Sequence, residues 1–358
     1  MKTKDKIKEI RKEIDKIDLK ILELLNLRAK KVKSIFEEKD KNKIPFFDPS
    51  REKKIVDKLQ KFNKGPLTRK DIEIIMDGIF KVYRSINKPL TIAYFGPSGT
   101  FTHQAALKRF GEKSVYVPCR TIENVFKEVE KERVDYGVVP IENSSEGVVT
   151  HTLDMFLESD VEITSEILLK IHHYLLSKEK SIQKIKKIYS HSQAFAQCQK
   201  WIEEHLKNAI LIETESTSTA AERVKKERNS ASIGSEIGAK IYNLNILAEK
   251  IEDFKENITR FLVIGRSSPE ESGNDKTSIL FSIKDRVGAL HDMLVPFKEY
   301  NINLTRIESR PSKKKAWEYV FFVDFIGHKD DINVKRALNN VEKVSVFLKI
   351  LGSYPREG

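Results

Sequence analysis

The chain has 358 residues, of which 39% are hydrophobic and 33% charged, and it carries a formal net charge of +12. This length allows two or three domains, and the apolar content is high enough for packed cores, which excludes wholesale disorder. The two cysteines form neither a disulfide framework nor a zinc motif, so we expect a reducing compartment and no metal. The first residues lack the apolar run of a signal peptide and no apolar stretch is as long as a membrane span, so we expect a cytoplasmic protein.

Most of the positive charge lies in the first quarter of the chain. Residues 1–90 contain 26 Lys or Arg and 15 Asp or Glu, which leaves a net charge of 26 − 15 = +11. Solvated helix faces, a nucleic-acid surface, or a few arginines that hold a small anion would each explain this charge. Interleaved acidic residues argue against the nucleic-acid surface.

An apolar residue recurs every three or four positions from Ile7 to Leu24, which predicts one long helix that ends near Glu38. The next position of this seam is Arg28, a charge that needs a partner if it is buried. Arg11 points about 100° away from Arg28 on such a helix, so a second copy of the helix would be needed to bring both to one ligand.

Two further helices are predicted before residue 90. Asp48 and Pro49 are typical of a helix start, and this second helix is expected to end near Phe62. Thr68 and Asp71 resemble a capping box that opens a third helix ending near Asn87.

Residues 5–88, with three helices of which one is very long, resemble the all-helical chorismate mutases, and we assign residues 1–88 to this domain. The resemblance implies an intertwined dimer that converts chorismate to prephenate by a Claisen rearrangement, without a nucleophile or a proton transfer. Fixed cationic donors would hold the compact conformer and stabilise charge on the ether oxygen. The positions implied are Arg11, donated across the dimer, with Arg28, Lys39, Asp48, Arg51, Glu52, Tyr83 and Asn87.

Strand-like and helix-like segments alternate between residues 90 and 267, which predicts an α/β domain with ligands at the loops that leave its strands. Several loops are rich in small polar residues: GPSGTFT, PIENSSEG, SHSQ, STSTAA and NITRF. Helix capping would explain most of them taken singly. Glu142 is less easily explained, because a carboxylate directly after VVPI needs a partner if it is buried.

Taken in order, these five motifs resemble prephenate dehydratase. The resemblance implies two α/β lobes like those of periplasmic binding proteins, and no metal or organic cofactor. The reaction would remove CO₂ and water from prephenate to give phenylpyruvate, with Thr259 hydrogen-bonding to or protonating the leaving hydroxyl. The prephenate-binding positions implied are Thr100, Glu142, Asn143, Ser144, Ser190, Gln197, Arg260 and Phe261.

A polar linker at residues 267–275 precedes a segment with the order βαββαβ, which predicts a ferredoxin-like domain at residues 276–358. The segment resembles an ACT domain of the dehydratase type. The resemblance implies a phenylalanine site between two such domains, formed by Gly288, Ala289, Leu290, Glu308, Ser309 and Arg310. If the two lobes remain soluble without it, we expect deletion of residues 272–358 to remove control by phenylalanine without removing activity.

The whole chain thus resembles the bifunctional chorismate mutase/prephenate dehydratase family of phenylalanine biosynthesis. Its expected partners are chorismate, prephenate and inhibitory L-phenylalanine, in a homodimer or tetramer that binds neither nucleic acid nor membrane. Two alternatives remain at this point: a dehydratase whose helical head only dimerises, and a ligand-sensing regulator without enzyme activity. Arogenate also remains open as the second substrate.

Overall fold

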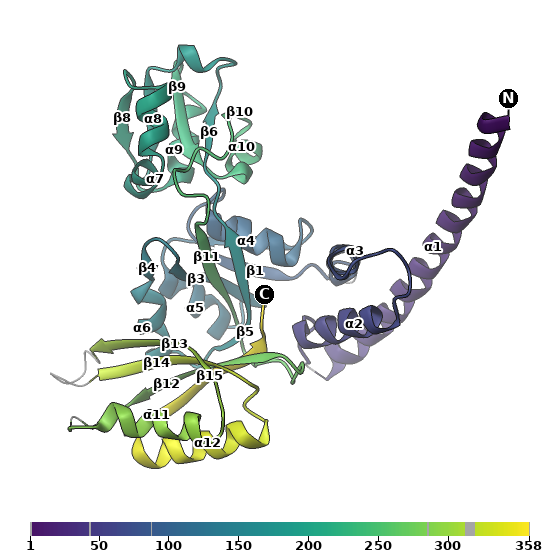
Figure 1. The fold of residues 1–358 in the computed structure, drawn as a ribbon. Helices are drawn as coiled ribbons and strands as arrows, with labels where there is room; N and C mark the ends of the chain where they lie inside the picture. Colours follow the sequence, from purple (N-terminus) through teal and green to yellow (C-terminus); the bar gives the residue numbers. More distant parts are fainter. Residues whose placement is uncertain (1, 43, 87, 285, 312–318, 358) are drawn as a thin grey trace. The chain divides into compact units, whose positions relative to one another are not determined.

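The structure is a computed structural model that describes residues 2–42, 44–86, 88–284, 286–311 and 319–357 (Figure 1). The chain divides into two compact units, one formed by Met1–Asp48 and Val56–Pro89 and the other by Pro49–Ile55 and Leu90–Gly358. Within the described ranges, every helix is too short or too polar to cross a membrane.

The N-terminal region is helical, as its sequence pattern predicted. Its helices are α1 (Lys2–Lys41), α2 (Pro49–Phe62) and α3 (Arg69–Arg84). The predicted capping box at the start of α3 is confirmed: the Thr68 N–H donates to Asp71 Oδ2 at 2.8 Å, and the Asp71 N–H donates to Thr68 Oγ1 at 3.2 Å. These two bonds satisfy amide groups that have no partner within the helix.

The apolar seam of α1 is exposed in the single chain. Its residues are between 47% and 65% exposed: Ile7, Ile10, Ile14, Ile17, Ile21 and Leu24. Burial of one such side chain is worth about 1.5–3 kcal/mol, so the seam is a large apolar surface that this chain leaves uncovered.

The first α/β lobe is built on a mixed sheet with the strand order β2-β1-β3-β11-β5 and with β4 beside β3. The strands are β1 (Thr91–Phe95), β2 (Val115–Cys119), β3 (Tyr136–Asn143), β4 (Gly147–Val148), β5 (Glu162–Lys170) and β11 (Ile258–Gly265). The helices are α4 (Phe101–Phe110), α5 (Ile122–Glu130) and α6 (Thr150–Glu158). The first three strands are parallel, whereas β11 runs antiparallel to β3 and β5.

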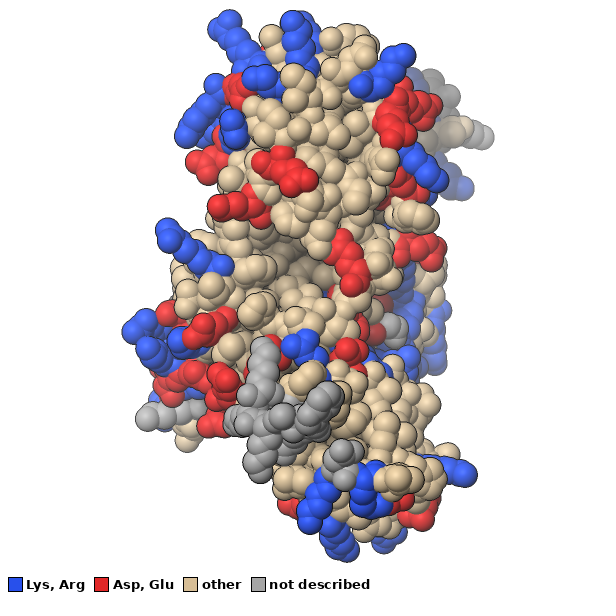
Figure 2. Space-filling model, turned by 90° about the vertical axis from the view of Figure 1, so that its left-hand side faces the viewer, with Lys and Arg blue, Asp and Glu red and all other residues tan. Residues whose placement is uncertain are grey.

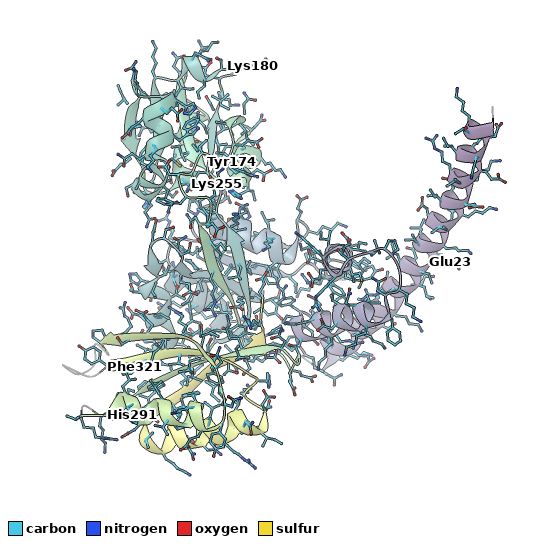
Figure 3. The ribbon with its side chains drawn as sticks, in the orientation of Figure 1. Glu23, Tyr174, Lys180, Lys255, His291 and Phe321 are labelled. Carbon is cyan, nitrogen blue, oxygen red and sulfur yellow. The ribbon has the colours of Figure 1, made fainter. Side chains whose placement is uncertain are left out.

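The second α/β lobe has the strand order β10-β6-β9-β7-β8. Its strands are β6 (Tyr174–Ser177), β7 (Lys187–Ser190), β8 (Ile210–Glu213), β9 (Ser230–Gly234) and β10 (Asn245–Ala248). Its helices are η1 (Ile182–Lys184), α7 (Ser192–Gln197), α8 (Gln199–His205), α9 (Thr217–Val224) and α10 (Glu236–Tyr242). The chain enters this lobe after β5 and returns before β11, and Figure 3 labels Tyr174 and Lys255 beside these two crossings.

The C-terminal sheet has the order β13-β14-β12-β15. Its elements follow the predicted βαββαβ pattern: β12 (Asp275–Ser282), α11 (Ala289–Glu299), β13 (Leu304–Pro311), β14 (Tyr319–Ile326), α12 (Ile332–Val344) and β15 (Phe347–Pro355). With the helical head and the two α/β lobes, this confirms the predicted fold class.

Both faces of the C-terminal sheet are buried at its central strands, β12 and β14, where successive side chains point to opposite faces. Leu280 and Phe322 join the hydrophobic core of the first lobe. Their neighbours Phe281 and Val323 pack instead in the core that contains residues of α11 and α12. Deletion of residues 272–358 would therefore expose the core of the first lobe, so the structure argues against the expected separability of this segment.

The C-terminal sheet also approaches the first lobe closely at a glycine. A Cβ atom at Gly352 would lie 2.4 Å from the carbonyl oxygen of Ile163 on β5, where φ at the glycine is +153°. Only a residue without a side chain fits at this distance, so Gly352 sets how closely β15 and β5 can approach.

We expect Gly352→Ala to lower the thermal unfolding midpoint of this unit by several degrees, because overpacking costs about 1–3 kcal/mol. Gly273→Ala is the matched control, since Gly273 also has a positive φ of +90° but has no atom within 4 Å of the added Cβ. Equal midpoints for the two variants, measured by circular dichroism, would contradict the close contact.

Candidate functional site

A cleft of about 1100 Å³ lies between the two α/β lobes. The first lobe contributes the loop from Gly96 to Thr102 together with Asn143 and Thr259, and the second lobe contributes residues of α7 and of the start of α9. Figure 2 shows the hollow in this face of the molecule, with few charged side chains in its visible lining. The cleft therefore brings together residues of all five polar motifs: GPSGTFT, PIENSSEG, SHSQ, STSTAA and NITRF.

Pairing of β11 with β3 places Thr259 directly opposite Asn143. The Asn143 side-chain amide donates to Thr259 Oγ1 at 2.7 Å and to Asn257 Oδ1 at 2.7 Å. A threonine hydroxyl has one proton to donate, and the bond from Asn143 uses an acceptor position. The O–H of Thr259 is thus left for a ligand in the cleft.

Glu146 joins the two lobes across the cleft. It follows β3 in the first lobe, and its carboxylate accepts hydrogen bonds from the side-chain amides of Gln193 and, at 2.8 Å, of Gln197, both on α7 in the second lobe. The other end of the Gln197 amide accepts from Asn257 at 3.1 Å. A continuous polar network thus runs from Thr259 through the two asparagines to the second lobe.

His173 is buried at the base of the cleft, with 2% of its surface exposed. Burial lowers the pKa of His173, although the hydrogen bond with Gln197 acts in the opposite direction, so the ring is neutral. Its Nε2 lies 2.7 Å from Gln197 Oε1, an acceptor, which assigns the ring proton to Nε2. The bare Nδ1 is buried and has no hydrogen-bond partner among the described atoms.

The loop GPSGTFT is held by Thr100 and His103 at the start of α4. Thr100 lines the cleft and caps α4, where its hydroxyl accepts from the His103 N–H at 3.4 Å. Burial lowers the pKa of His103 to about 4, so its neutral Nδ1 accepts a hydrogen bond from the Gly99 N–H at 3.2 Å.

Three other predicted positions lie in three different environments: the cleft lining, the loop after β3 and the protein interior. Phe261 is 1% exposed and lines the cleft. Ser144 donates to the Glu256 carbonyl at 3.3 Å and accepts from the Ile258 N–H at 3.0 Å, so it fastens the loop after β3. Ser190 is fully buried and donates to the Ile233 carbonyl at 2.8 Å, and it does not belong to the cleft lining.

Glu142 and Arg260 are also absent from the cleft lining. They lie next to Asn143 and Thr259 along their strands, and alternation directs them to the opposite face of the sheet. There the Arg260 guanidinium donates a hydrogen bond to Glu142 Oε1 at 3.2 Å. Glu142, whose side chain is 32% exposed, thus has the kind of partner that was expected from the sequence for a buried carboxylate.

In the helical head, Arg28 lies over two aromatic rings. Its guanidinium carbon is 4.8 Å from the centroid of the Tyr83 ring and 5.6 Å from that of Phe80. The Tyr83 hydroxyl donates to the Leu25 carbonyl at 2.7 Å, which fixes the ring under the cation.

The remaining predicted mutase positions are spread along α1 and α2. Arg11 is exposed on α1, and Lys39 Nζ donates to the Pro45 carbonyl at 2.9 Å. Asp48 immediately precedes α2, and Arg51 and Glu52 lie in its first turn. Asn87 lies outside the described residues.

The predicted phenylalanine motifs lie at one end of the C-terminal sheet. Ser282, the last residue of β12, pairs with Val320, and Val320 pairs with Arg310 of the second motif. Gly288 precedes α11 with φ of +78°, and a Cβ there would meet no atom within 4 Å. Val287 is fully exposed, and Figure 3 shows His291 at the free end of α11.

Several cleft residues escaped prediction from the sequence. Glu146 and Asn257 lie inside two of the recognised motifs, so their positions carried a signal that could have been used. Arg120 and His173 lie in no motif, and only the fold brings them to the cleft. No group of three or more His, Cys, Asp or Glu suited to a metal ion occurs in the part of the chain that the structure describes.

Three stretches of the chain match known protein families. Residues 92–269 match prephenate dehydratase, residues 10–88 match chorismate mutase type II, and residues 277–343 match the ACT domain.

Relatives align over nearly the whole length. The chain is 50% identical over 356 residues to a bifunctional chorismate mutase/prephenate dehydratase of Aquifex aeolicus, covering 98% of each chain. It is 43% identical over 362 residues to one of Pseudomonas aeruginosa, covering 99% of each. Among solved structures, prephenate dehydratase from Arthrobacter aurescens in complex with L-Phe matches with a TM-score of 0.70 and 35% identity, covering 75% of this chain and 90% of that chain.

Proposed function

The chain belongs to the bifunctional chorismate mutase/prephenate dehydratase family, and on that premise we propose how its residues perform and control the two reactions. The protein has both activities and acts in phenylalanine biosynthesis. The alternatives of a purely dimerising head and of a ligand sensor without activity are thereby set aside.

Prephenate is dehydrated in the cleft between the α/β lobes, with Thr259 as the donor to the leaving hydroxyl. The observation that supports this assignment is the hydrogen bond from Asn143 to Thr259 Oγ1 at 2.7 Å, which orients the hydroxyl and leaves its proton for the substrate. As the C–O bond breaks, negative charge grows on the departing oxygen, and a fixed donor stabilises that charge. Loss of CO₂ from the ring supplies the electrons that form the aromatic product.

The two carboxylates of prephenate require positive potential in the cleft. Arg120 lines it, and the cleft-lining residues Phe101 and Thr217 are the first residues of α4 and α9. The N-terminal end of a helix presents unpaired N–H groups and a partial positive charge. We assign these groups to binding of the dianion, with Gln197 and Asn257 completing the polar wall.

Chorismate is rearranged in the helical head of a homodimer. Arg11 and Arg28 are 17 residues apart on α1, which is about 25 Å at about 1.5 Å per residue, so one helix cannot direct both to one small substrate. The exposed apolar seam of α1 supports a second copy packed along it. In that arrangement each site combines Arg28 of one protomer with Arg11 of its partner.

Phenylalanine inhibits the dehydratase by binding at the ACT domains. Gly288 leaves open space where the ligand backbone would approach, and Ala289 and Leu290 begin α11 beside it. The solved relative in complex with L-Phe supports the choice of effector. We assign the other wall of this phenylalanine site to a second ACT domain in the dimer.

We expect Arg28→Ala and Arg11→Ala each to abolish mutase activity and to spare dehydratase activity on supplied prephenate. When equal amounts are unfolded together and refolded, half of the dimers are mixed, and each mixed dimer has one intact site. Mutase activity should thus recover to about one quarter of the wild-type rate, as two-fold symmetry requires. Each variant refolded alone is the control, and no recovery in the mixture would contradict shared sites.

We expect Thr259→Ala to lower the dehydratase kcat by roughly 10²–10³-fold, the usual effect of removing one donor to a developing oxyanion. Thr259→Ser keeps the hydroxyl and should retain far more activity. Mutase activity of the same preparations serves as the internal control for concentration and folding. Similar kcat values for the Ala and Ser variants would rule out a role for the hydroxyl.

We expect Gly288→Asn to remove inhibition by phenylalanine without loss of dehydratase activity. Asparagine tolerates the positive φ that a bulky leucine would strain, yet its side chain occupies the space of the ligand. The conversion of chorismate to phenylpyruvate is followed with and without phenylalanine, and binding is measured by calorimetry. Gly273→Asn, in the polar linker at positive φ, is the control. Unchanged inhibition of the Gly288 variant would place the effector elsewhere.

A further inference from the structure

Arg260 is buried where the first lobe meets the ACT sheet, although it directly follows Thr259. Its side chain is 7% exposed. The guanidinium donates to Glu166 Oε2 at 2.7 Å, to Asp324 Oδ2 at 2.6 Å and to the Tyr354 hydroxyl at 2.9 Å, as well as to Glu142. Asp324 and Tyr354 belong to β14 and β15, so the ACT domain supplies two of the acceptors that this catalytic-lobe arginine uses.

Two further cations of the ACT domain complete the cluster. Lys276 donates to both oxygens of Glu166, at 3.0 and 2.7 Å. Arg306 on β13 pairs with Glu142 at 3.0 Å. We call these six charged side chains the interface cluster: Glu142, Glu166 and Arg260 from the first lobe, with Lys276, Arg306 and Asp324 from the ACT domain.

The charges of the interface cluster balance only when both domains are present. The first lobe contributes two carboxylates and one cation, a net charge of −1, and the ACT domain contributes two cations and one carboxylate, a net charge of +1. A buried charge without its partner is strongly unfavourable, so each domain requires the other to keep these groups in place. The attraction of Arg260 lowers the pKa of Asp324 despite its burial, which keeps that carboxylate ionised.

The interface cluster is one residue away from the proposed dehydratase groups on both strands. Thr259 pairs with Asn143, and Arg260 pairs with Glu142, in the same antiparallel register. The register shifts immediately afterwards, between Arg260 and Phe261. Regular ladder bonds are interrupted at such a bulge, so side-chain contacts have more influence on where the strands lie.

β13 links the interface cluster to the phenylalanine motif. Arg306, Glu308 and Arg310 alternate with residues of the opposite face, and all three are half-buried. Arg306 binds Glu142, and Arg310 binds Asp154 of α6 at 3.1 Å. A ligand that displaces this strand therefore pulls directly on the residue before Asn143.

We propose that the ACT sheet is a structural part of the dehydratase centre, in which Arg306 and Asp324 position Asn143 and Thr259 through Glu142 and Arg260. Glu142 and Arg260 are then positioning residues rather than ligands of prephenate. This inference rests on the proposed function of the Asn143–Thr259 pair. In this proposal, phenylalanine acts on the dehydratase by shifting β13.

The test compares Arg306→Gln with Lys349→Gln in the full-length protein. Lys349 crosses the same interface from β15, where it donates to the carbonyls of Phe156 and Ser159 at 3.2 and 2.6 Å, both at α6 and its C-terminal end rather than on β3 or β11. We expect Arg306→Gln to lower the dehydratase kcat by about 10–100-fold, the usual effect of misplacing reacting groups by about 1 Å. The KM for prephenate and the mutase rate should stay within about threefold, and Lys349→Gln should keep its kcat.

A double-mutant cycle separates positioning from general destabilisation. If Arg306 acts through Glu142, then Glu142→Gln combined with Arg306→Gln should lower kcat no further than the worse single variant. Arg306→Lys keeps the charge and should restore part of kcat, and it also provides a soluble variant if Arg306→Gln does not fold. Thermal midpoints of all variants are recorded with the kinetics.

Three results would overturn the inference: a wild-type kcat in Arg306→Gln, equal losses in Arg306→Gln and Lys349→Gln, or fully multiplicative effects in the cycle. Thr259→Ala is assayed in the same experiment, so that failure of the positioning role can be told apart from failure of the proposed function. If Thr259→Ala is inactive while Arg306→Gln is fully active, only the positioning role is lost. If Thr259→Ala is fully active, the site assignment itself is wrong.

Discussion

The antiparallel pairing of β11 with β3 is the interaction on which the dehydratase unit depends. It brings together two motifs that are more than one hundred residues apart and aligns Thr259 with Asn143 and Arg260 with Glu142. One face of this pairing closes the cleft and the other meets the ACT sheet. Because a strand directs adjacent side chains to opposite faces, one short stretch of each strand serves both the chemistry and the domain interface.

Much of this organisation could be predicted from the sequence, because local patterns and motif order are physical constraints. The heptad spacing of α1, the capping box at Thr68 and the βαββαβ order of the last segment all appear as predicted. The ordered polar loops indicated an α/β domain, and glycine and small polar residues at strand ends are typical of ligand-binding turns. The placement of Thr259 beside Asn143 agrees with that hypothesis, although their catalytic roles remain predictions.

The direction of neighbouring side chains could not be predicted in the same way. Glu142 and Arg260 lie inside recognised motifs, so the sequence grouped them with the substrate-binding residues. Their partners Asp324 and Arg306 are far away in the sequence, and they become visible only when the ACT sheet is packed on the first lobe. The interpretation of residues 267–275 as a linker to a separable module was misleading for the same reason, since Leu280 and Phe322 are core residues of the neighbouring lobe.

The free energy of the contacts in the interface cluster is in the range that a regulatory role requires. An effector shifts an enzyme only by its difference in affinity for two arrangements, and this coupling is typically about 1–3 kcal/mol. Ion pairs contribute from about 0.2–1 kcal/mol when exposed to about 3–5 kcal/mol when one partner of a buried pair is removed, so making or breaking the partly buried ion pair between Arg306 and Glu142 is of the required magnitude. Partly detached arrangements leave buried charges unpaired and are disfavoured, which limits the interface to a few distinct states. If phenylalanine acts through this contact as proposed, reciprocity requires that prephenate bound in the cleft weaken phenylalanine binding by the same factor.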